Sequence, residues 1–196
     1  MRFLLQCGVS AFCRGAPLRA CAAARQAESV QPPRRKKQLV TKVITVPDNL
    51  QKGCDDFNAG RFYESHEHFE EIWQYERGAC RDAYKGLIQV AAAFVNLSRG
   101  KYAGAERLLR TSLGYLAPYR ETGALGFDIE GLCRDTEKVY ERLVTGGKQR
   151  LSGMDLRQRP HYSFDSALLR AHAVRDRAWG FDEGGHALPM EITVAA

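Results

Sequence analysis

Residues 58–73 read Asn-Ala-Gly-Arg-Phe-Tyr-Glu-Ser-His-Glu-His-Phe-Glu-Glu-Ile-Trp, and this stretch decides both the fold and the candidate site. At about 100° per residue, Phe62, Phe69 and Trp73 fall on one face of a helix. Three large rings on one face are typical of a helix that packs against other helices. The stretch therefore predicts an amphipathic helix beginning at Arg61 or Phe62, just after Gly60.

A titratable pair accompanies these rings. On the same helical wheel His66 lies between the rings and Glu70 lies at their edge, so we expect both side chains to turn toward the apolar interior. Burying such groups without partners costs several kcal/mol. We therefore expect the pair to have partners or a ligand. Three other carboxylates of the stretch are predicted to point into solvent, namely Glu64, Glu67 and Glu71.

Two interpretations of the pair stay open. In the first, His66 and Glu70 belong to a structural polar network that fixes how two helices pack. In the second, His66 is a general base that Glu70 orients, so that both are candidate catalytic residues. Neighbouring side chains could assist in binding, and the candidates are Tyr63, Glu67, Trp73, Gln89 and Asn96.

A metal centre is not predicted. His66-Glu67-x-x-Glu70 resembles the zinc helix motif His-Glu-x-x-His, but Glu70 replaces its second histidine. A di-iron carboxylate bundle needs Glu-x-x-His on two helices, and position 63 holds Tyr. No phosphate-binding glycine loop and no nucleophile elbow is present. The sequence thus assigns neither a reaction nor a cofactor.

Helical patterns continue through residues 48–145. We expect a first helix from Pro47 to about Asn58, the His66 helix to about Glu76, and a buried third helix over 82–98. Gln89 and Asn96 lie on one side of that third helix. A fourth helix is expected over 102–116, and a fifth from Ile129 until Gly146-Gly147 ends it. The fold class predicted is all-α, a compact bundle of about five helices packed as antiparallel hairpins.

The two ends of the chain differ from this middle part. We expect residues 1–38 to be a disordered targeting leader, residues 48–145 the helical bundle and residues 146–196 a partly helical, largely irregular extension. One short helix is predicted around 167–177, with an Asp165-Ser166 start. Strand-like alternation occurs only in 40–46, where no strand partner is apparent.

Charge is distributed unevenly along the chain. The net charge is +6, but residues 1–38 alone carry +7 and residues 39–196 carry −1. Because nucleic-acid surfaces cluster Lys and Arg on the folded body, we expect no nucleic-acid partner. No run of eighteen apolar residues is present, so no membrane span is predicted either.

The leader resembles an organellar transit peptide because it is basic, nearly free of acidic residues and ends in Pro32-Pro33-Arg34-Arg35-Lys36-Lys37. A plastid is favoured over a mitochondrion, and a secretory signal and a basic tail without a targeting role are the alternatives. Three cysteines lie outside the leader, without a Cys-x-x-Cys pair, which fits a reducing compartment. Of these, Cys133 is predicted to be a small core residue.

Several motifs in order resemble one family. The pattern Phe57-Asn58-x-Gly60-x-Phe62-Tyr63-Glu64-x-His66-Glu67-x-x-Glu70-x-x-Trp73 is followed by Gly86-Leu87-Ile88-Gln89-Val90-Ala91, Arg99-Gly100, Gly104-Ala105 and Leu108-Leu109. This is similar to the family called domain of unknown function 309, over about residues 48–145. The resemblance implies a small all-helical protein and no assigned reaction. The family's signature maps here onto Glu64, His66, Glu67, Glu70, Trp73 and Gln89.

Together these features predict a binding or scaffold module that presents helical hairpins to a protein or small ligand. The alternative is a small hydrolase-like or metal-assisted enzyme that uses His66 and Glu70 in a pocket between helices. The module is preferred because no nucleophile, phosphate-binding loop or complete set of metal ligands accompanies the pair.

Overall fold

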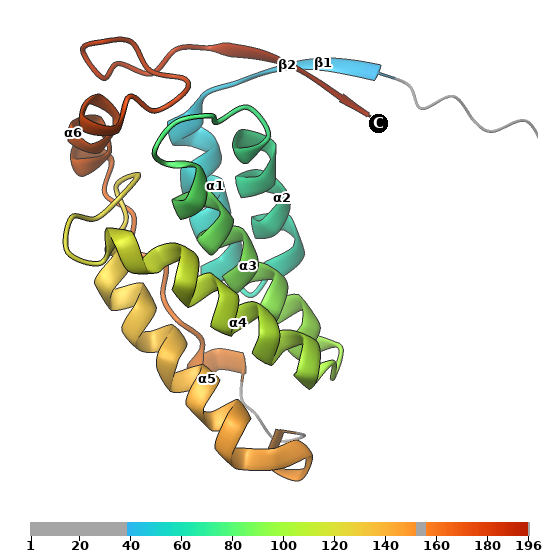
Figure 1. The fold of residues 1–196 in the computed structure, drawn as a ribbon. Coiled ribbons are helices and arrows are strands. Elements are labelled where there is room, and N and C mark those ends of the chain that lie inside the picture. The colour runs from blue at the N-terminus through green and yellow to red at the C-terminus, as the bar shows by residue number, and fades with distance from the viewer. Residues whose placement is uncertain (1–38, 152–155, 196) are drawn as a thin grey trace, which may run out of the picture. The chain divides into compact units, whose positions relative to one another are not determined.

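The computed structural model describes residues 39–151 and 156–195, so the predicted leader over 1–38 lies outside the described residues. Within these ranges the chain is mainly helical, which confirms the all-α class (Figure 1). The elements in order are β1 (Leu39–Ile44), α1 (Val46–Asn58), α2 (Phe62–Trp73), α3 (Arg81–Ser98), α4 (Tyr102–Leu116), α5 (Ile129–Leu151), α6 (Ser166–Asp176) and β2 (Met190–Ala195). Short 3-10 turns follow α4 and precede α6, at Ala117–Tyr119 and Leu156–Gln158.

Each helix from α1 to α5 packs against its neighbour in sequence, as the hairpin prediction requires (Figure 1). Helix α3 is the most buried, as predicted, because half of its residues lose all or nearly all contact with solvent. Two glycines let helices approach closely. A Cβ on Gly53 would lie 2.6 Å from the Phe69 ring, and one on Gly86 would lie 2.5 Å from Leu116. These positions set the contacts of α1 with α2 and of α3 with α4.

Two helix ends differ from the prediction. Helix α2 ends at Trp73 and not near Glu76, because Arg81 donates to the carbonyls of both residues and takes the place of further helical hydrogen bonds. Helix α5 continues through Gly146-Gly147 to Leu151. The residues after the two glycines, Lys-Gln-Arg-Leu over 148–151, all favour helix, and this offsets the cost of the glycines.

The last part of the chain is more ordered than predicted. Helix α6 begins as expected, where the Asp165 carboxylate accepts from the Ala167 N–H at 2.7 Å. The segment predicted to be irregular ends in β2, which pairs antiparallel with β1 from Leu39↔Ala195 to Ile44↔Met190. The partner of the predicted strand was missed because it lies about 150 residues away, beyond the reach of local patterns.

Residues after 156 also contribute to the core beneath α1 and α3. Tyr162 is buried, its ring stacks on Phe57 at 4.1 Å between centroids, and its hydroxyl donates to the Leu87 carbonyl at 2.8 Å. Asn58 at the end of α1 binds both backbone groups of Tyr162, at 2.9 and 3.0 Å. The segment between α5 and α6 therefore closes one side of the helical core.

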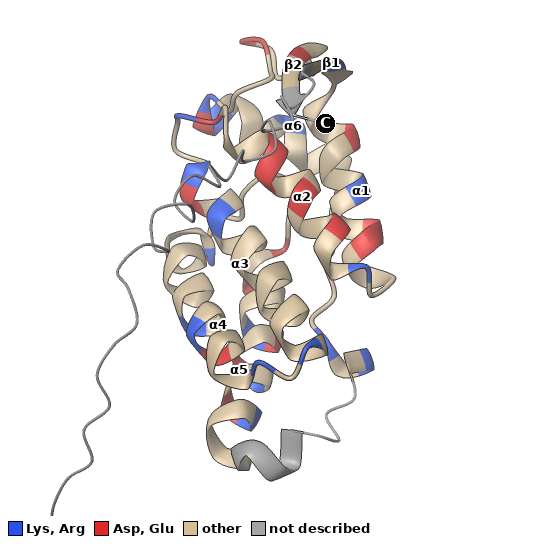
Figure 2. Cartoon of the chain, turned by 90° about the vertical axis from the view of Figure 1, so that its right-hand side faces the viewer, with Lys and Arg blue, Asp and Glu red and all other residues tan. Residues whose placement is uncertain are grey.

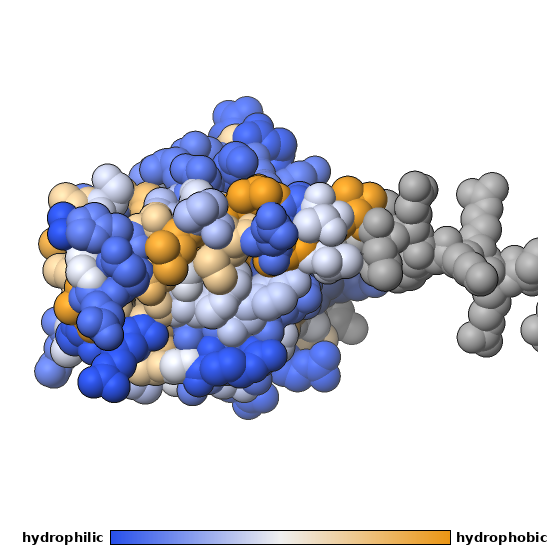
Figure 3. Space-filling model, turned by 90° about the horizontal axis from the view of Figure 1, so that it is seen from above, coloured by the Kyte–Doolittle hydropathy of each residue, from blue (hydrophilic) through white to orange (hydrophobic). Residues whose placement is uncertain are grey.

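The surface is mixed in polarity. Seen from the end that carries the strands, apolar side chains lie among polar ones (Figure 3). The large apolar side chains that remain exposed are Val40, Val43, Tyr63, Val144, Leu168, Val174 and Leu188. Among the described residues, none of the helices combines the length and the apolar character that crossing a membrane requires.

Candidate functional site

The buried face of α2 differs from the one that its aromatic residues alone predict. Its buried residues are Phe62, Ser65, Phe69 and Ile72. On a helical wheel at 100° per residue, the centre of these four buried positions is shifted toward Ile72. His66 then lies about 80° from that centre, and Glu70 about 120° from it. Because Ser65 is small, it packs inward where a larger polar side chain could not.

As a result, the His66–Glu70 pair lies at the surface. The side chain of His66 keeps 23% of its exposure and that of Glu70 keeps 39%. The prediction that both turn into the apolar interior is therefore wrong. The physical reason is that Ser65 and Ile72 complete the inward arc, which leaves the pair on the outward flank of α2.

His66 has two carboxylate neighbours. Its Nδ1 lies 3.1 Å from Oε1 of Glu67 and 3.7 Å from Oε2 of Glu70. Its ring is stacked on Tyr63, with 6.3 Å between centroids and 16° between planes. Tyr63 itself is 55% exposed. Glu67, predicted to point into solvent away from the pair, instead reaches back to the imidazole of the preceding residue.

The predicted amide partners lie elsewhere. Asn96 faces α4, where its Nδ2 would lie 3.1 Å from a Cβ on Gly104. Gln89 has a buried Oε1 without a hydrogen-bond partner. Among the described residues, no hydrogen bond joins His66 or Glu70 to either amide. The polar network between helices that the sequence suggested is therefore not formed at this pair.

Trp73 has a structural role at the end of α2. The Arg81 guanidinium lies over its ring at 4.2 Å, and Arg81 also donates to its carbonyl at 2.7 Å. This arrangement joins the end of α2 to the start of α3. It is a cation–π contact reinforced by a charge-assisted hydrogen bond.

Acidic residues lie along both α1 and α2 (Figure 2). On the α1 side of α2, Asp56 pairs with Arg61 at 2.5 Å and with His68 at 3.2 Å. Glu71, predicted to be solvated, is only 12% exposed and binds Lys42 at 2.5 Å and Asn49 at 2.7 Å. These carboxylates are compensated by positive or donating groups that other elements supply.

On the outward side, Glu67 and Glu70 have no Lys or Arg partner within the described part of the chain. Their nearest titratable neighbour is His66, and one donor atom from each of the three side chains lies within 4.8 Å of the other two. In residues 39–151 and 156–195 this is the one set of three such side chains close enough to share an ion. The outward flank therefore carries negative charge that the fold does not neutralise.

Sequence reasoning missed a buried carboxylate, Glu76. Its Oε1 accepts from the Gly78 N–H at 2.6 Å and its Oε2 accepts from the Trp179 N–H at 2.9 Å. Trp179 also stacks on Tyr75 at 5.1 Å. Glu76 thus attaches the segment after α6 to the connection between α2 and α3. No local pattern indicates this, because its main partner is 103 residues away.

The cysteines of the described region are structural. Cys54, Cys80 and Cys133 are free and buried, as expected for Cys133. Burial raises the pKa of the Cys80 thiol, and the Asp176 carboxylate beside it adds to the effect. Burial likewise raises the pKa of Cys54. Both remain thiols, which are poor nucleophiles.

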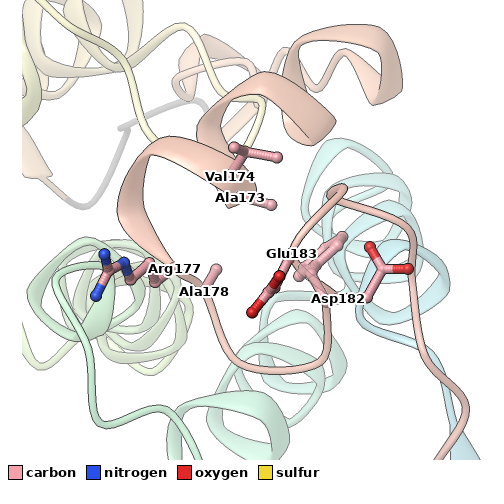
Figure 4. Close-up of a pocket in the computed structure, with 7 residues that line it drawn as sticks. Ala173, Val174, Arg177, Ala178, Asp182 and Glu183 are labelled. Atoms are coloured by element: carbon pink, nitrogen blue, oxygen red, sulfur yellow. The ribbon is translucent and has the colours of Figure 1, made fainter.

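A cavity of about 590 Å³ lies between the end of α6 and the loop that follows it (Figure 4). Ala173, Val174 and Ala178 form much of its wall, and Glu183 borders it from the loop. The Arg177 side chain extends away from Glu183 (Figure 4). No residue that the sequence predicted as a site lines this cavity.

Comparison with known proteins finds similarity over the region that holds α2. The family described as "Domain of unknown function (DUF309)" matches residues 50–108. The chain is also similar to "Uncharacterized protein YpuF" of Bacillus subtilis (strain 168), with 37% identity over 93 residues, which is 46% of this chain. The chain spans about half the length of that curated relative, 53%. The match to the family model thus confirms the resemblance to DUF309 for residues 50–108, the part that holds most of α1, all of α2 and α3 and the first half of α4.

Proposed function

We propose that this protein is a binding module whose contact surface is the outward flank of α2, formed by Tyr63, His66, Glu67 and Glu70 and here called the α2 face. The partner is a protein that brings positive charge to this face. The observation that carries the proposal is the pair of carboxylates, Glu67 and Glu70, held beside an exposed tyrosine and without a Lys or Arg partner from the residues that the structure describes.

Each part of the α2 face suits a contact with a partner. Tyrosine offers a large rigid surface with a polar tip and is enriched in protein interfaces. Uncompensated carboxylates steer an oppositely charged partner and fix how it binds. The stretch 46–74 carries seven carboxylates and two Lys or Arg side chains, which extends the negative field over α1.

The enzymatic alternative is less favoured by the same geometry. A general base acts best in a site that excludes water and positions a substrate. His66 and Glu70 lie instead on the outward flank of α2, with side chains that are 23% and 39% exposed. We therefore propose binding in preference to catalysis.

A photo-crosslinking experiment tests the proposal. Tyr63 is replaced by p-benzoylphenylalanine in one full-length protein, and Arg110 on α4 is replaced in a second, as the control. Each protein is irradiated in an extract of the native host, and adducts are identified by mass spectrometry. We expect a defined adduct at position 63 alone, which is lost at about 1 M salt, where charges are screened beyond about 3 Å.

A matched variant decides the outcome. The position-63 adduct should disappear when Glu67→Gln and Glu70→Gln are added, and it should form again with the purified partner. Equal adducts at positions 63 and 110, or an adduct that the two Gln substitutions leave unchanged, would contradict the proposal.

We also propose that residues 1–38 deliver the protein to a plastid. The support is composition alone: the segment is basic and nearly free of acidic residues. A fusion of residues 1–38 to a fluorescent protein should accumulate in plastids of a plant or algal cell. Fluorescence in mitochondria or throughout the cytosol would contradict this.

A further inference from the structure

The cavity beside α6 has the size of a binding site for a small organic molecule. Its volume of about 590 Å³ lies within the range of about 300 to 1,000 Å³ that such sites have in proteins. Small side chains leave this space open, because Ala173 and Ala178 are buried in the wall and end at Cβ. Val174 and Phe181 add larger apolar surface. The wall thus suits the apolar part of a ligand.

The loop that borders the cavity, residues 177–188, is attached to α6. Arg170 of α6 donates from Nε to the Gly184 carbonyl at 2.9 Å. Gly185 has a φ of 73° and lies close against Val174, where a Cβ on the glycine would come within 2.7 Å of Cγ2. Because the chain itself holds this loop in place, binding a ligand costs little ordering of the loop.

Two carboxylates border the cavity, and their environments differ. Asp182 accepts from the N–H groups of Gly184 and His186, at 2.9 and 2.8 Å, and its side chain points away from the cavity (Figure 4). Glu183 extends its carboxylate from the loop toward Ala178 (Figure 4). Within residues 39–151 and 156–195, Glu183 has no hydrogen-bond or ion-pair partner. One uncompensated negative charge therefore faces the apolar wall.

The one basic residue of the wall does not neutralise this charge. Arg177 ends α6 in the left-handed conformation, with a φ of 48°. From there its guanidinium extends away from Glu183 (Figure 4). The charge directed into the cavity is therefore negative, which disfavours an anionic ligand.

An apolar wall with one carboxylate matches a molecule that joins an apolar body to a single positive charge. An ammonium group can donate charge-assisted hydrogen bonds to the Glu183 carboxylate. The Phe181 ring in the same wall offers a second attractive contact, since the face of an aromatic ring attracts cations. Removal of water by the apolar body strengthens the attraction between the two charges.

We propose that this cavity binds a small organic amine in its protonated form. The apolar part lies against Ala173, Val174 and Phe181, and the ammonium group lies beside Glu183. A free amine suits the cavity better than the lysine side chain of a protein, because this volume accommodates a whole organic molecule. The inference does not use the α2 face, so it goes beyond the proposed function and can fail without it.

Titrations of the full chain, followed in ¹H–¹⁵N NMR spectra, test the inference. The probes are phenethylammonium chloride, neutral 2-phenylethanol and the anion 3-phenylpropanoate, which share a phenyl ring and differ in charge. We expect the ammonium to bind about tenfold more tightly than either of the others, as a hydrogen bond to a charged group provides. The shifted amide signals should belong to residues 173–188.

Glu183→Gln separates the effect of charge from that of shape. The affinity for phenethylammonium should fall about tenfold, to that for 2-phenylethanol, whose own affinity should stay within about twofold. Glu141→Gln is the matched control, because Glu141 is also exposed but lies on α5, outside the cavity. It should bind the ammonium within about twofold of wild type.

Several outcomes would overturn the inference. These are an absence of saturable binding by the ammonium, equal binding of the ammonium and the alcohol by wild type, and tightest binding of the propanoate. A Glu183→Gln protein that keeps the preference, or an equal loss in Glu141→Gln, would do the same. N-acetyl-lysine methylamide, which presents the ammonium of a protein lysine, should bind more weakly than phenethylammonium. Equal or tighter binding would contradict the assignment to a free amine.

Discussion

The carboxylate of Glu76 and those of Glu67 and Glu70 are only a few residues apart in sequence, but their environments are opposite. Glu76 is buried, with 1% of its surface exposed, and each of its oxygens accepts a backbone N–H. Glu67 and Glu70 lie earlier in the chain, on the outside of α2, where His66 is beside them and the described residues supply no Lys or Arg partner. Glu76 therefore joins two distant parts of the chain, whereas the described contacts of Glu67 and Glu70 stay within their own helix.

The difference shows where the fold uses its charges. A buried carboxylate is tolerated only when donors satisfy it, so its partners must be built into the fold. A half-exposed pair of like charges adds no stability and is slightly unfavourable. The α2 face is thus the part of α2 that the fold does not need, and this is why we interpret it as a binding surface.

Glu76→Ala tests the buried side of this comparison and should have the largest effect. It leaves the N–H groups of Gly78 and Trp179 without an acceptor, and we expect a loss of about 3 kcal/mol in the free energy of unfolding. Urea denaturation measures this, with Glu67→Ala as the control, expected within about 0.5 kcal/mol of wild type. A loss below about 1 kcal/mol in Glu76→Ala would show that this attachment is not significant.

Tyr162→Phe tests whether the segment after α5 is attached to the core in the same way. The substitution keeps the stacking on Phe57 and removes the hydroxyl that donates to the Leu87 carbonyl. We expect a loss of about 1 kcal/mol in the free energy of unfolding. An unchanged value would mean that the buried hydroxyl gains nothing from its partner.

His172 provides the histidine counterpart of His66. Its Nδ1 accepts from the Gly126 N–H at 3.0 Å, and burial lowers the pKa of His172 below its usual 6.5, with Arg175 adding to the effect. The unfolded chain therefore takes up this proton first as pH falls. The contribution of neutral His172 to the free energy of unfolding is therefore fully present above pH 6.5 and is lost as pH falls through the lowered pKa.

The measurement compares unfolding in urea between about pH 7.5 and pH 5 for wild type and His172→Gln. The wild type should lose more stability than the variant over this window. Parallel curves for the two proteins would contradict the assignment of a neutral, accepting His172.

Glu67→Gln with Glu70→Gln should have the smallest effect on stability. Removing two like charges from the outside of α2 should leave the free energy of unfolding within about 0.5 kcal/mol of wild type, or raise it slightly. Thermal unfolding at low and high salt measures this. A loss above about 1 kcal/mol would mean that these carboxylates support the fold, contrary to the comparison.

Much of the fold could be predicted from the sequence because its helices are defined locally. Periodic apolar residues predicted α3 and α4, and Asp165-Ser166 predicted the start of α6. The β1–β2 pairing and the attachment of Trp179 to Glu76 could not be predicted, since both join segments that are more than 100 residues apart.

His66 and Glu70 lie on a helix, as predicted, but on its outward flank and not on its inward face. The prediction rested on the aromatic rings and did not include Ser65, whose burial moves the centre of the buried face of α2 away from His66. The side-chain conformation that brings Glu67 to His66 has no signal in the pattern, because neighbours in sequence are expected on different sides of a helix.

The free energy of unfolding of His66→Ala is the most direct test of the central claim. If the α2 face is a surface for binding, the variant should unfold within about 0.5 kcal/mol of wild type, because the polar and ring partners of the imidazole among the described residues are half-exposed groups of its own helix. A loss of about 1 to 3 kcal/mol would instead make His66 part of a structural network and would contradict this account.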